Sequence, residues 1–212
     1  MENPFINFQT IMAKLGSGKL VAVSKNQSKQ DIALMQALGV TDFGENQVQK
    51  LLQRYQDFPE LNWHFIGQLQ RNKVKYLLGK TVLIQSLDSL ALAQEIQKQA
   101  AKQNIVINCL LQLKFDNDEK RGGVELSALP QLWDYLQSCE FIRIQGFMAV
   151  APQTDATKLM AIFSKAKEIY DCYQTIDKEI CYLSLGMSAD YEIALSCGAN
   201  MIRIGEKLFT KK

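Results

Sequence analysis

The chain has 212 residues, enough for one sizeable core, and its 47% hydrophobic and 22% charged residues are ordinary for a globular domain. A formal net charge of +2 argues against a protein dedicated to nucleic-acid binding. The first residues lack the basic-then-apolar pattern of a signal peptide and no apolar run is long enough to cross a membrane, so we expect a cytoplasmic protein.

In chain order, segments typical of helices alternate with segments typical of strands. The predicted strands cover residues 20–25, 42–46, 63–67, 82–87, 107–114, 142–150, 182–188 and 201–209. The predicted helices cover residues 29–38, 47–55, 71–78, 89–103, 126–139, 157–177 and 191–197, preceded by an additional N-terminal helix over 6–14. No linker rich in proline, glycine or serine interrupts this order, so we expect a single domain over residues 1–212.

Eight strands alternating with helices is the count for a (β/α)8, or TIM, barrel, which is the α/β fold that we predict. An open doubly wound sheet is the alternative, although it would usually carry fewer strands. In a barrel the carboxyl ends of all strands meet at one face, where active sites lie. Residues at the predicted strand ends are therefore the first candidates for function.

Lys25 ends the apolar run 20–24 and is the most informative residue of the chain. Strand alternation places Val21, Val23 and Lys25 on one face, so the amine is predicted to point inward with two core residues. An interior amine is more easily held in its neutral, nucleophilic form. The alternative is a lysine that only terminates a strand and extends into water.

The last two predicted strand ends carry a second signal. Residues 184–190 run from a strand into a helix, and residues 203–206 close the final strand. Barrels recurrently bind phosphate with the loops after strands 7 and 8, where Ser188 offers a hydroxyl and glycine allows close backbone approach. The alternative is a capped helix, with Ser188 or Asp190 satisfying its own backbone.

Arg203 supplies a third signal. It shares a face with Met201 and Gly205, so its guanidinium is predicted to point into the barrel beside the phosphate site. A buried arginine keeps its charge and requires an acceptor, and an ion pair with a carboxylate is the alternative explanation. A reactive lysine, a phosphate cradle and an inward arginine on one face together indicate pyridoxal 5′-phosphate (PLP) as the cofactor.

Cysteine and histidine usage argues against a metal site. The five cysteines include no C-x-x-C pair and His64 is the single histidine, so no zinc site is predicted. One histidine also weakens any Ser-His-Asp or Cys-His arrangement, although His64 could in principle serve one. Because His64 lies between Trp63 and Phe65, one of which we expect to point inward, its ring is predicted to face the helix layer in a structural role.

The chain is similar to the pyridoxal phosphate homeostasis protein family, short relatives of the alanine racemase N-terminal barrel. The matching stretches are L-V-A-V-S-K (20–25), F-G-E-N (43–46), W-H-F-I-G-Q-L-Q-R-N-K (63–73), L-S-L-G-M-S-A-D (183–190) and I-R-I-G (202–205). The resemblance spans essentially the whole chain, and the block over 63–73 is highly specific. It implies an alanine racemase N-terminal-domain-like barrel that binds PLP.

The resemblance also implies a cofactor site, with no catalytic residue and no metal ligand assigned. Lys25 is implied as the lysine that forms a Schiff base with PLP, and Arg203 as the neighbour of the pyridine nitrogen. The other implied cofactor-binding residues are Asn46, Met148, Ser188, Gly205 and Glu206, the last through its backbone. Two features depart from the family pattern: a glutamate stands at 206 in place of a small or hydroxyl residue, and the ending 209–212 lacks the usual Gly-x-Arg-x-Tyr.

Two classes of function compete. The first is a PLP-dependent amino-acid racemase or decarboxylase of fold type III, in which the second base of the racemases comes from an additional carboxyl-terminal domain. The second is a carrier, which Arg203 favours because an arginine beside the ring nitrogen can only donate a hydrogen bond and weakens the electron sink. We expect a monomeric carrier in intracellular PLP homeostasis, with apo PLP-dependent enzymes as recipients and at most weak side activity.

Overall fold

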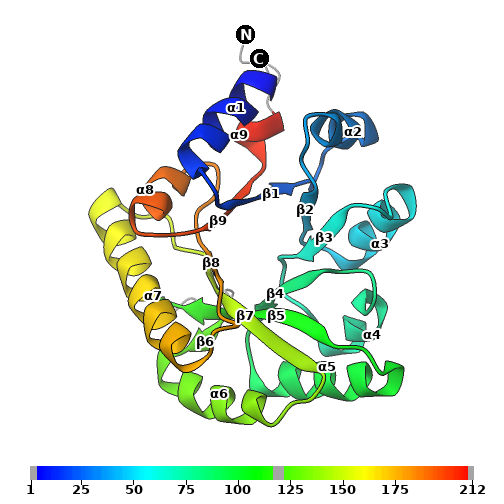
Figure 1. Ribbon diagram of the computed structural model, residues 1–212, viewed down its shortest axis with the longest axis vertical. Coiled ribbons are helices and arrows are strands. Elements are labelled where there is room, and N and C mark those ends of the chain that lie inside the picture. Colours follow the sequence, from blue (N-terminus) through cyan, green and yellow to red (C-terminus); the bar gives the residue numbers. More distant parts are fainter. Residues whose placement is uncertain (1–3, 117–121, 210–212) are drawn as a thin grey trace.

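A computed structural model describes residues 4–116 and 122–209, so the last three residues lie outside the described part of the chain. Within that part, eight parallel strands form a closed ring surrounded by helices (Figure 1). The barrel strands are β1 (Lys19–Val23), β2 (Asp42–Glu45), β3 (Asn62–Phe65), β4 (Leu83–Leu87), β5 (Ile107–Lys114), β7 (Ile142–Ala149), β8 (Tyr182–Ser184) and β9 (Met201–Ile204). Pairing of β1 with β9 and of β4 with β5 completes the ring, which confirms the predicted (β/α)8 barrel and excludes the open sheet.

Helices follow the strands around the outside of the barrel (Figure 1). They are α1 (Pro4–Leu15), α2 (Lys29–Ala37), α3 (Val48–Asp57), α4 (Val74–Leu77), α5 (Leu90–Gln103), α6 (Leu129–Gln137), α7 (Ala156–Ile176), α8 (Tyr191–Ser196) and α9 (Glu206–Phe209). The predicted extra N-terminal helix is α1, which packs against α9 at the top of Figure 1. No helix of the described residues combines the length and the apolar character that a membrane crossing requires.

Capping side chains explain where several helices begin. Ser28 and Asp31 form a capping box at α2, with the Ser28 hydroxyl accepting from the Asp31 amide and the Asp31 carboxylate accepting from the Ser28 amide. Ser89 and Asp155 cap α5 and α7 with side-chain oxygens that accept from a first-turn amide. The predicted helix over 126–139 opens as a 3₁₀-helix, Leu126–Ala128, before α6, and the helix over 71–78 likewise opens as the 3₁₀-helix Arg71–Lys73 before α4.

Strand β8 ends four residues before its predicted end. Gly186 turns the chain with a φ of 84°, a conformation that favours glycine. A Cβ at this position would lie 2.7 Å from the Cα of Tyr191 in α8. The turn therefore lets α8 pack closely against the strand end and frees residues 185–190 to form a loop.

Strand β9 also ends early, because the predicted strand over 201–209 contains both a strand and a helix. The amides of Leu208 and Phe209 donate to the carbonyl of Gly205, at 2.9 and 3.2 Å, so the chain turns into α9 directly after the strand. A further two-residue strand, β6 (Val124–Glu125), pairs with the end of β5 and was not predicted.

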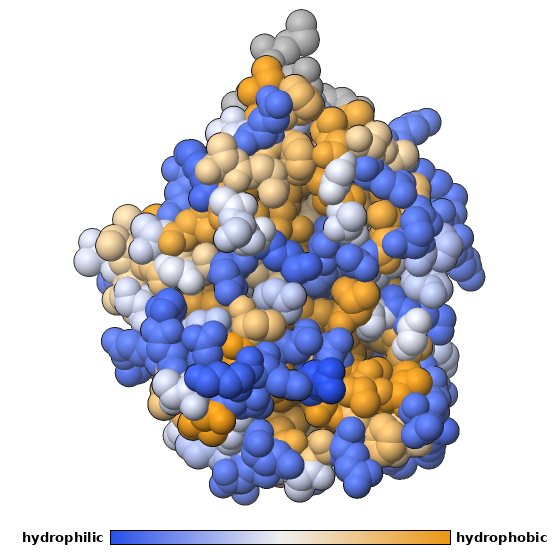
Figure 2. All heavy atoms as spheres, viewed as in Figure 1, coloured by the Kyte–Doolittle hydropathy of each residue, from blue (hydrophilic) through white to orange (hydrophobic). Residues whose placement is uncertain are grey.

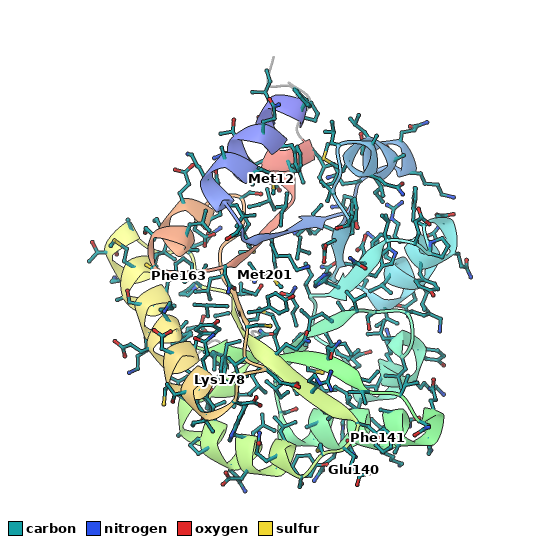
Figure 3. The ribbon with its side chains drawn as sticks, viewed as in Figure 1. Met12, Glu140, Phe141, Phe163, Lys178 and Met201 are labelled. Atoms are coloured by element: carbon teal, nitrogen blue, oxygen red, sulfur yellow. The ribbon has the colours of Figure 1, made fainter. Side chains whose placement is uncertain are left out.

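The strands separate two hydrophobic clusters. A small inner cluster of Val21, Leu83, Leu110, Met148 and Met201 fills part of the barrel, and Met201 is labelled near the middle of the ring in Figure 3. The larger cluster joins the outer side of the strands to the helices. In the space-filling view, hydrophilic side chains spread across the middle of this face, whereas hydrophobic ones gather in its upper part, where Figure 1 places α1 (Figure 2).

The predicted direction of His64 is wrong. Trp63 and Phe65 belong to the outer cluster, and His64 between them points into the barrel, where it contacts Gln85. Gln85 in turn contacts the sulfur of Met201, a member of the inner cluster. The reason is space, because large aromatic side chains fit between the sheet and the helices more readily than inside an eight-stranded barrel.

Closure of the ring depends on Gly146 in β7. Its φ is 145°, and a Cβ built there would lie 1.8 Å from the carbonyl oxygen of Tyr182 in β8. We expect Gly146→Ala to lower the free energy of unfolding by more than about 3 kcal/mol, because a backbone clash adds to the unfavourable backbone conformation. Urea denaturation followed by circular dichroism measures this loss.

Gly39→Ala is the matched control for that experiment. Gly39 also has a positive φ, 93°, but no atom lies within 4 Å of a Cβ placed there. Its substitution should cost only the conformational strain of about 1–3 kcal/mol. Equal losses for the two variants would contradict a special role of Gly146 in strand packing.

Candidate functional site

The carboxyl ends of the barrel strands gather the residues that the sequence singles out. Lys25 and Asn46 follow β1 and β2, Met148 lies near the end of β7, Ser188 lies in the loop after β8, and Arg203, Gly205 and Glu206 lie at or just after the end of β9. Hydrogen bonds and close contacts join several of these segments directly, as described below. Arg203 is the charged group among them that is buried.

Arg203 points into the barrel, as strand alternation predicts, and is 3% exposed. Its Nη1 donates to the carbonyl oxygen of Ser184 at 2.8 Å and to the hydroxyl of Ser184 at 2.6 Å. Its Nη2 donates to the carbonyl oxygen of Ala149 at 2.9 Å. Burial lowers the pKa of Arg203 to about 10, opposed by the negative charge of Asp190, so the guanidinium remains charged at neutral pH.

The acceptors of Arg203 are neutral, so the described residues do not show the ion pair that was the alternative explanation. Within the described residues, its three hydrogen bonds go to two backbone carbonyls and one hydroxyl, and no carboxylate contacts it. A guanidinium carries five N–H donors, so these bonds leave two of them without an acceptor in that part of the chain. An N–H donor that these bonds leave unused can donate to a ligand that offers a lone pair.

Lys25 does not lie where the alternation places it. Strand β1 ends at Val23, and residues 24–27 form a turn closed by the Gln27 amide, which donates to the Ser24 carbonyl at 3.0 Å. Asn26 has a φ of 64°, a left-handed conformation that takes the chain out of the strand direction. The Lys25 side chain is exposed, so the prediction of an interior amine is wrong.

The turn that carries Lys25 is anchored to β2. The amide of Ser24 donates to the carbonyl of Gly44 at 3.0 Å, and its hydroxyl donates to Oε1 of Glu45 at 2.8 Å. Glu45 is fully buried, and burial raises the pKa of its carboxyl, opposed by the Ser24 hydroxyl and by the charges of Arg54 and Lys50. Sequence analysis did not identify Glu45 as part of the site, although it directly precedes Asn46.

Side chains of helix α3 also hold this turn in place. The Arg54 guanidinium donates to the carbonyl of Gln27, and its Nε lies 3.8 Å from Oε1 of Glu45. Lys50 donates to the side-chain oxygen of Asn26 at 3.3 Å. The position of Lys25 is therefore fixed through its backbone neighbours, while its side chain stays accessible.

Ser188 links the loops that follow β8 and β9. Its hydroxyl oxygen accepts hydrogen bonds from the amides of Gly205 at 3.3 Å and Lys207 at 3.4 Å. Asp190 instead satisfies its own loop, because its carboxylate accepts from the Met187 amide at 2.6 Å. Asp190 is the N-cap residue of α8 but makes no side-chain capping hydrogen bond, so the helix-capping alternative does not describe its carboxylate. Ser188 brings together the two loops after β8 and β9 on which the phosphate prediction depends.

The remaining predicted site residues are Asn46, Met148 and Glu206, and the contacts described above do not include their side chains. Asn46 is exposed and lines a cavity of about 320 Å³ with residues such as Gln68, Gln70 and Lys73, whereas Lys25 and Arg203 do not line it within the described part of the chain. Met148 is buried in the inner cluster, and the side chain of Glu206 is exposed. In the same part of the chain, no group of three or more His, Cys, Asp or Glu side chains is arranged to hold a metal ion.

Comparisons with known proteins agree on one family. The family model described as alanine racemase, N-terminal domain, matches residues 5–211. A pyridoxal phosphate homeostasis protein from Aquifex aeolicus (strain VF5) is 39% identical, with 92% of this chain and 87% of that protein aligned.

Solved structures extend the comparison to the fold. PipY from Synechococcus elongatus PCC7942 is 31% identical and has been solved without PLP and with PLP bound. The TM-scores are 0.92 and 0.89, covering 98% of this chain and 100% of PipY. An alanine racemase of Clostridium difficile 630, at 16% identity, shares the fold with a TM-score of 0.81 over 99% of this chain and 56% of the racemase.

The contact between Ser24 and Glu45 gives a prediction about the Lys25 turn. We expect Ser24→Ala to lower the free energy of unfolding by about 1–3 kcal/mol, because it leaves a buried carboxylate oxygen without its hydroxyl donor. Ser17→Ala, at an exposed serine just before β1, should change it by less than about 0.5 kcal/mol. Urea denaturation of both variants tests this, and equal small changes would contradict the anchoring role of Glu45.

Proposed function

Because this chain belongs to the pyridoxal phosphate homeostasis protein family, whose barrel is the alanine racemase N-terminal domain, we propose that it binds PLP and holds it for delivery within the cell. The observation that carries the proposal is Arg203, a buried charged guanidinium with unused N–H donors at the carboxyl end of the barrel. The relatives named for PLP homeostasis and the PLP-bound structure of PipY support it.

Arg203 fits the pyridine nitrogen of the cofactor. That nitrogen offers one lone pair, which an unused N–H of the guanidinium can donate to. Arginine does not give up its proton at neutral pH, so it favours the unprotonated ring. The bonds to Ser184 and Ala149 fix the plane of the guanidinium and with it the direction of the free donors.

Lys25 is the residue that would form the Schiff base. PLP would supply the aldehyde with which the Lys25 amine could condense, and the condensation would release one molecule of water. The turn over 24–27 is held by Glu45 and Arg54, and the Lys25 side chain is exposed. In this proposal the accessible amine would bind the cofactor and would let it leave again. This combination suits a protein that must release what it binds.

The phosphate would lie where Ser188 joins the two loops. The Ser188 hydroxyl already accepts from the amides of Gly205 and Lys207 and keeps its own hydrogen for an anion. Gly205 would allow close backbone approach, and the backbone of Glu206 would complete the proposed cradle. Asn46 and Met148 would line the pocket around the ring. The carboxylate of Glu206 is exposed, and in this proposal it would point away from the phosphate.

The alternative is a PLP-dependent racemase or decarboxylase of fold type III. PLP supplies such enzymes with a ring that accepts an electron pair from the substrate carbon, and it does so best when the ring nitrogen is protonated. Arg203 disfavours that protonation, so we propose a carrier without substantial catalysis. We further propose that the whole chain is one domain, acts as a monomer in the cytoplasm and supplies apo PLP-dependent enzymes.

The Schiff base is tested by replacing Lys25. Wild-type protein mixed with PLP should give a visible absorption band that borohydride removes, and Lys25→Ala should lose that reducible chromophore. Lys29→Ala is the matched control, because Lys29 is an exposed lysine that pairs with Asp57 on the neighbouring helix. Mass spectrometry of the reduced protein that places the adduct on another lysine would contradict the assignment.

Pyridoxal serves as the control for the phosphate cradle. It carries the same aldehyde and ring but no phosphate, so it can react with Lys25 yet gains nothing from Ser188 and the loop amides. We expect it to bind wild-type protein far more weakly than PLP does. Equal affinities for the two compounds would rule out the cradle while leaving the Schiff base standing.

The carrier proposal predicts little turnover of amino acids. Exchange of the α-proton of alanine and serine for deuterium should be slower than about 1 per second, the lower end of ordinary enzyme turnover, because Arg203 keeps the ring a poor electron sink. The Lys25→Ala variant shows how much exchange is caused by free PLP. Faster exchange that is lost in this variant would overturn the carrier proposal in favour of an enzyme.

A further inference from the structure

A line of polar side chains crosses the interior of the barrel, and we call it the interior chain. Its members are Asp42 in β2, His64 in β3, Gln85 in β4, Ser184 in β8 and Arg203 in β9. All five are buried, with exposed fractions of 7%, 1%, 0%, 0% and 3%. Polar groups in this position are costly unless they satisfy one another, so their contacts define a single connected unit.

The first half of the interior chain lies toward the amino ends of the strands. Oδ1 of Asp42 contacts Nε2 of His64 at 2.9 Å, and Nδ1 of His64 contacts Nε2 of Gln85 at 3.0 Å. Lys19 pairs with the same Asp42 oxygen at 3.1 Å. Lys19 and Asp42 also line a cavity of about 720 Å³ at that end of the barrel.

The second half reaches the cofactor end. Oε1 of Gln85 accepts from the hydroxyl of Ser184 at 2.8 Å, and the Ser184 oxygen accepts from Nη1 of Arg203 at 2.6 Å. The residues involved are far apart in sequence, since Gln85 and Ser184 are separated by 99 positions. The interior chain therefore connects the two ends of the barrel through four successive contacts.

The chemistry of its ends fixes the direction of every hydrogen bond. Arg203 can only donate, so the Ser184 oxygen must accept and its own hydrogen must go to Gln85. The side-chain oxygen of Gln85 accepts that hydrogen, so the NH₂ group of Gln85 is the part that faces His64. Nδ1 of His64 must therefore be an unprotonated acceptor, and the hydrogen of the imidazole sits on Nε2, where it is donated to Asp42.

The charges around His64 agree with a neutral imidazole. Burial lowers the pKa of His64, although Asp42 opposes that shift and the Lys19 charge adds to it. Burial alone would raise the pKa of Asp42, but the hydrogen bonds from His64 and Thr41 and the charge of Lys19 hold it well below its usual range. The interior chain thus has a carboxylate, Asp42, at one end and a guanidinium, Arg203, at the other.

We propose that Asp42, His64, Gln85 and Ser184 are positioning residues for Arg203, and that the protonation of His64 and the ligand at Arg203 influence each other. If His64 gained a proton, Nδ1 would become a donor and Gln85 would have to turn its carbonyl toward it. The Ser184 oxygen would then face two donors and its own hydrogen would lose its acceptor. Only the neutral Nε2–H form of His64 keeps Arg203 in its place.

The single histidine of the chain makes this directly measurable. In the full-length protein labelled with ¹⁵N-histidine, the two imidazole nitrogens give signals that identify the tautomer without any substitution. We expect the neutral Nε2–H form throughout the range from about pH 6 to 8, where a free histidine would titrate. A Nδ1–H tautomer, or an imidazolium that forms with an ordinary midpoint, would overturn the proposal.

Ser184→Ala tests whether the interior chain acts as a unit. It removes the link between Gln85 and Arg203, so the His64 nitrogen signals should shift although Ser184 does not touch His64. The matched control is Ser86→Ala, because the buried Ser86 hydroxyl in β4 has no hydrogen-bond partner among the described residues. Unchanged His64 signals in a folded Ser184→Ala protein would contradict the coupling.

Adding PLP extends the test to the ligand, and this step rests on the proposed function. In wild-type protein and in Ser86→Ala the His64 signals should move as the chromophore forms. Ser184→Ala is expected to bind PLP more weakly, and at equal chromophore absorbance the movement of its His64 signals should be lost. A chromophore without any movement in the wild type would overturn the influence of the ligand on His64. A missing chromophore would count against PLP binding itself, and the tautomer and Ser184→Ala results would still decide the interior chain.

Discussion

The buried positive charge of Arg203 constrains the whole carboxyl end of the barrel. A guanidinium away from water is stable only when its donors find acceptors, and here the acceptors come from the ends of two neighbouring strands. The carbonyls of Ser184 and Ala149 accept from the same side chain, so Arg203 joins β7, β8 and β9 at the place where the site is built. Because these acceptors are neutral, the charge remains available to a ligand.

A second constraint acts after β1, the strand that pairs with β9. Lys25 is exposed on a turn, but the turn is anchored through the buried carboxylate of Glu45 and the guanidinium of Arg54. The site therefore combines a rigid interior group with an accessible amine on a fixed backbone. A rigid donor and an accessible nucleophile together favour binding that is specific and reversible, which is what a carrier requires.

Sequence reasoning reached the barrel because apolar β-rich runs alternate with helical periodicity, and it placed Arg203 correctly because alternation holds to the end of β9. It failed for Lys25, because β1 ends at Val23 and Lys25 lies in the turn that follows. It also failed for His64, because the aromatic residues on either side of it pack against the helices and not inside the barrel. The ends of β8 and β9 were placed too late because glycine turns interrupt otherwise apolar runs.

The interior chain could not be found from the sequence at all. Its members come from five strands, and each pair in contact is 19 to 99 positions apart, so only the closed ring brings them together. A glutamine or serine in an apolar strand gives no local signal that distinguishes a network member from an isolated polar residue such as Ser86. Whether such a residue joins the network depends on which strands lie side by side and in what register. Periodicity specifies neither.

The central claim is that Arg203 holds the cofactor ring with its nitrogen unprotonated, which makes the protein a carrier. The ¹⁵N chemical shift of PLP labelled at the ring nitrogen, measured in the complex with the full chain at neutral pH, reads this state directly. The account predicts the shift of an unprotonated pyridine that accepts a hydrogen bond. The shift of a pyridinium would contradict it, because a protonated ring is the electron sink that amino-acid catalysis requires.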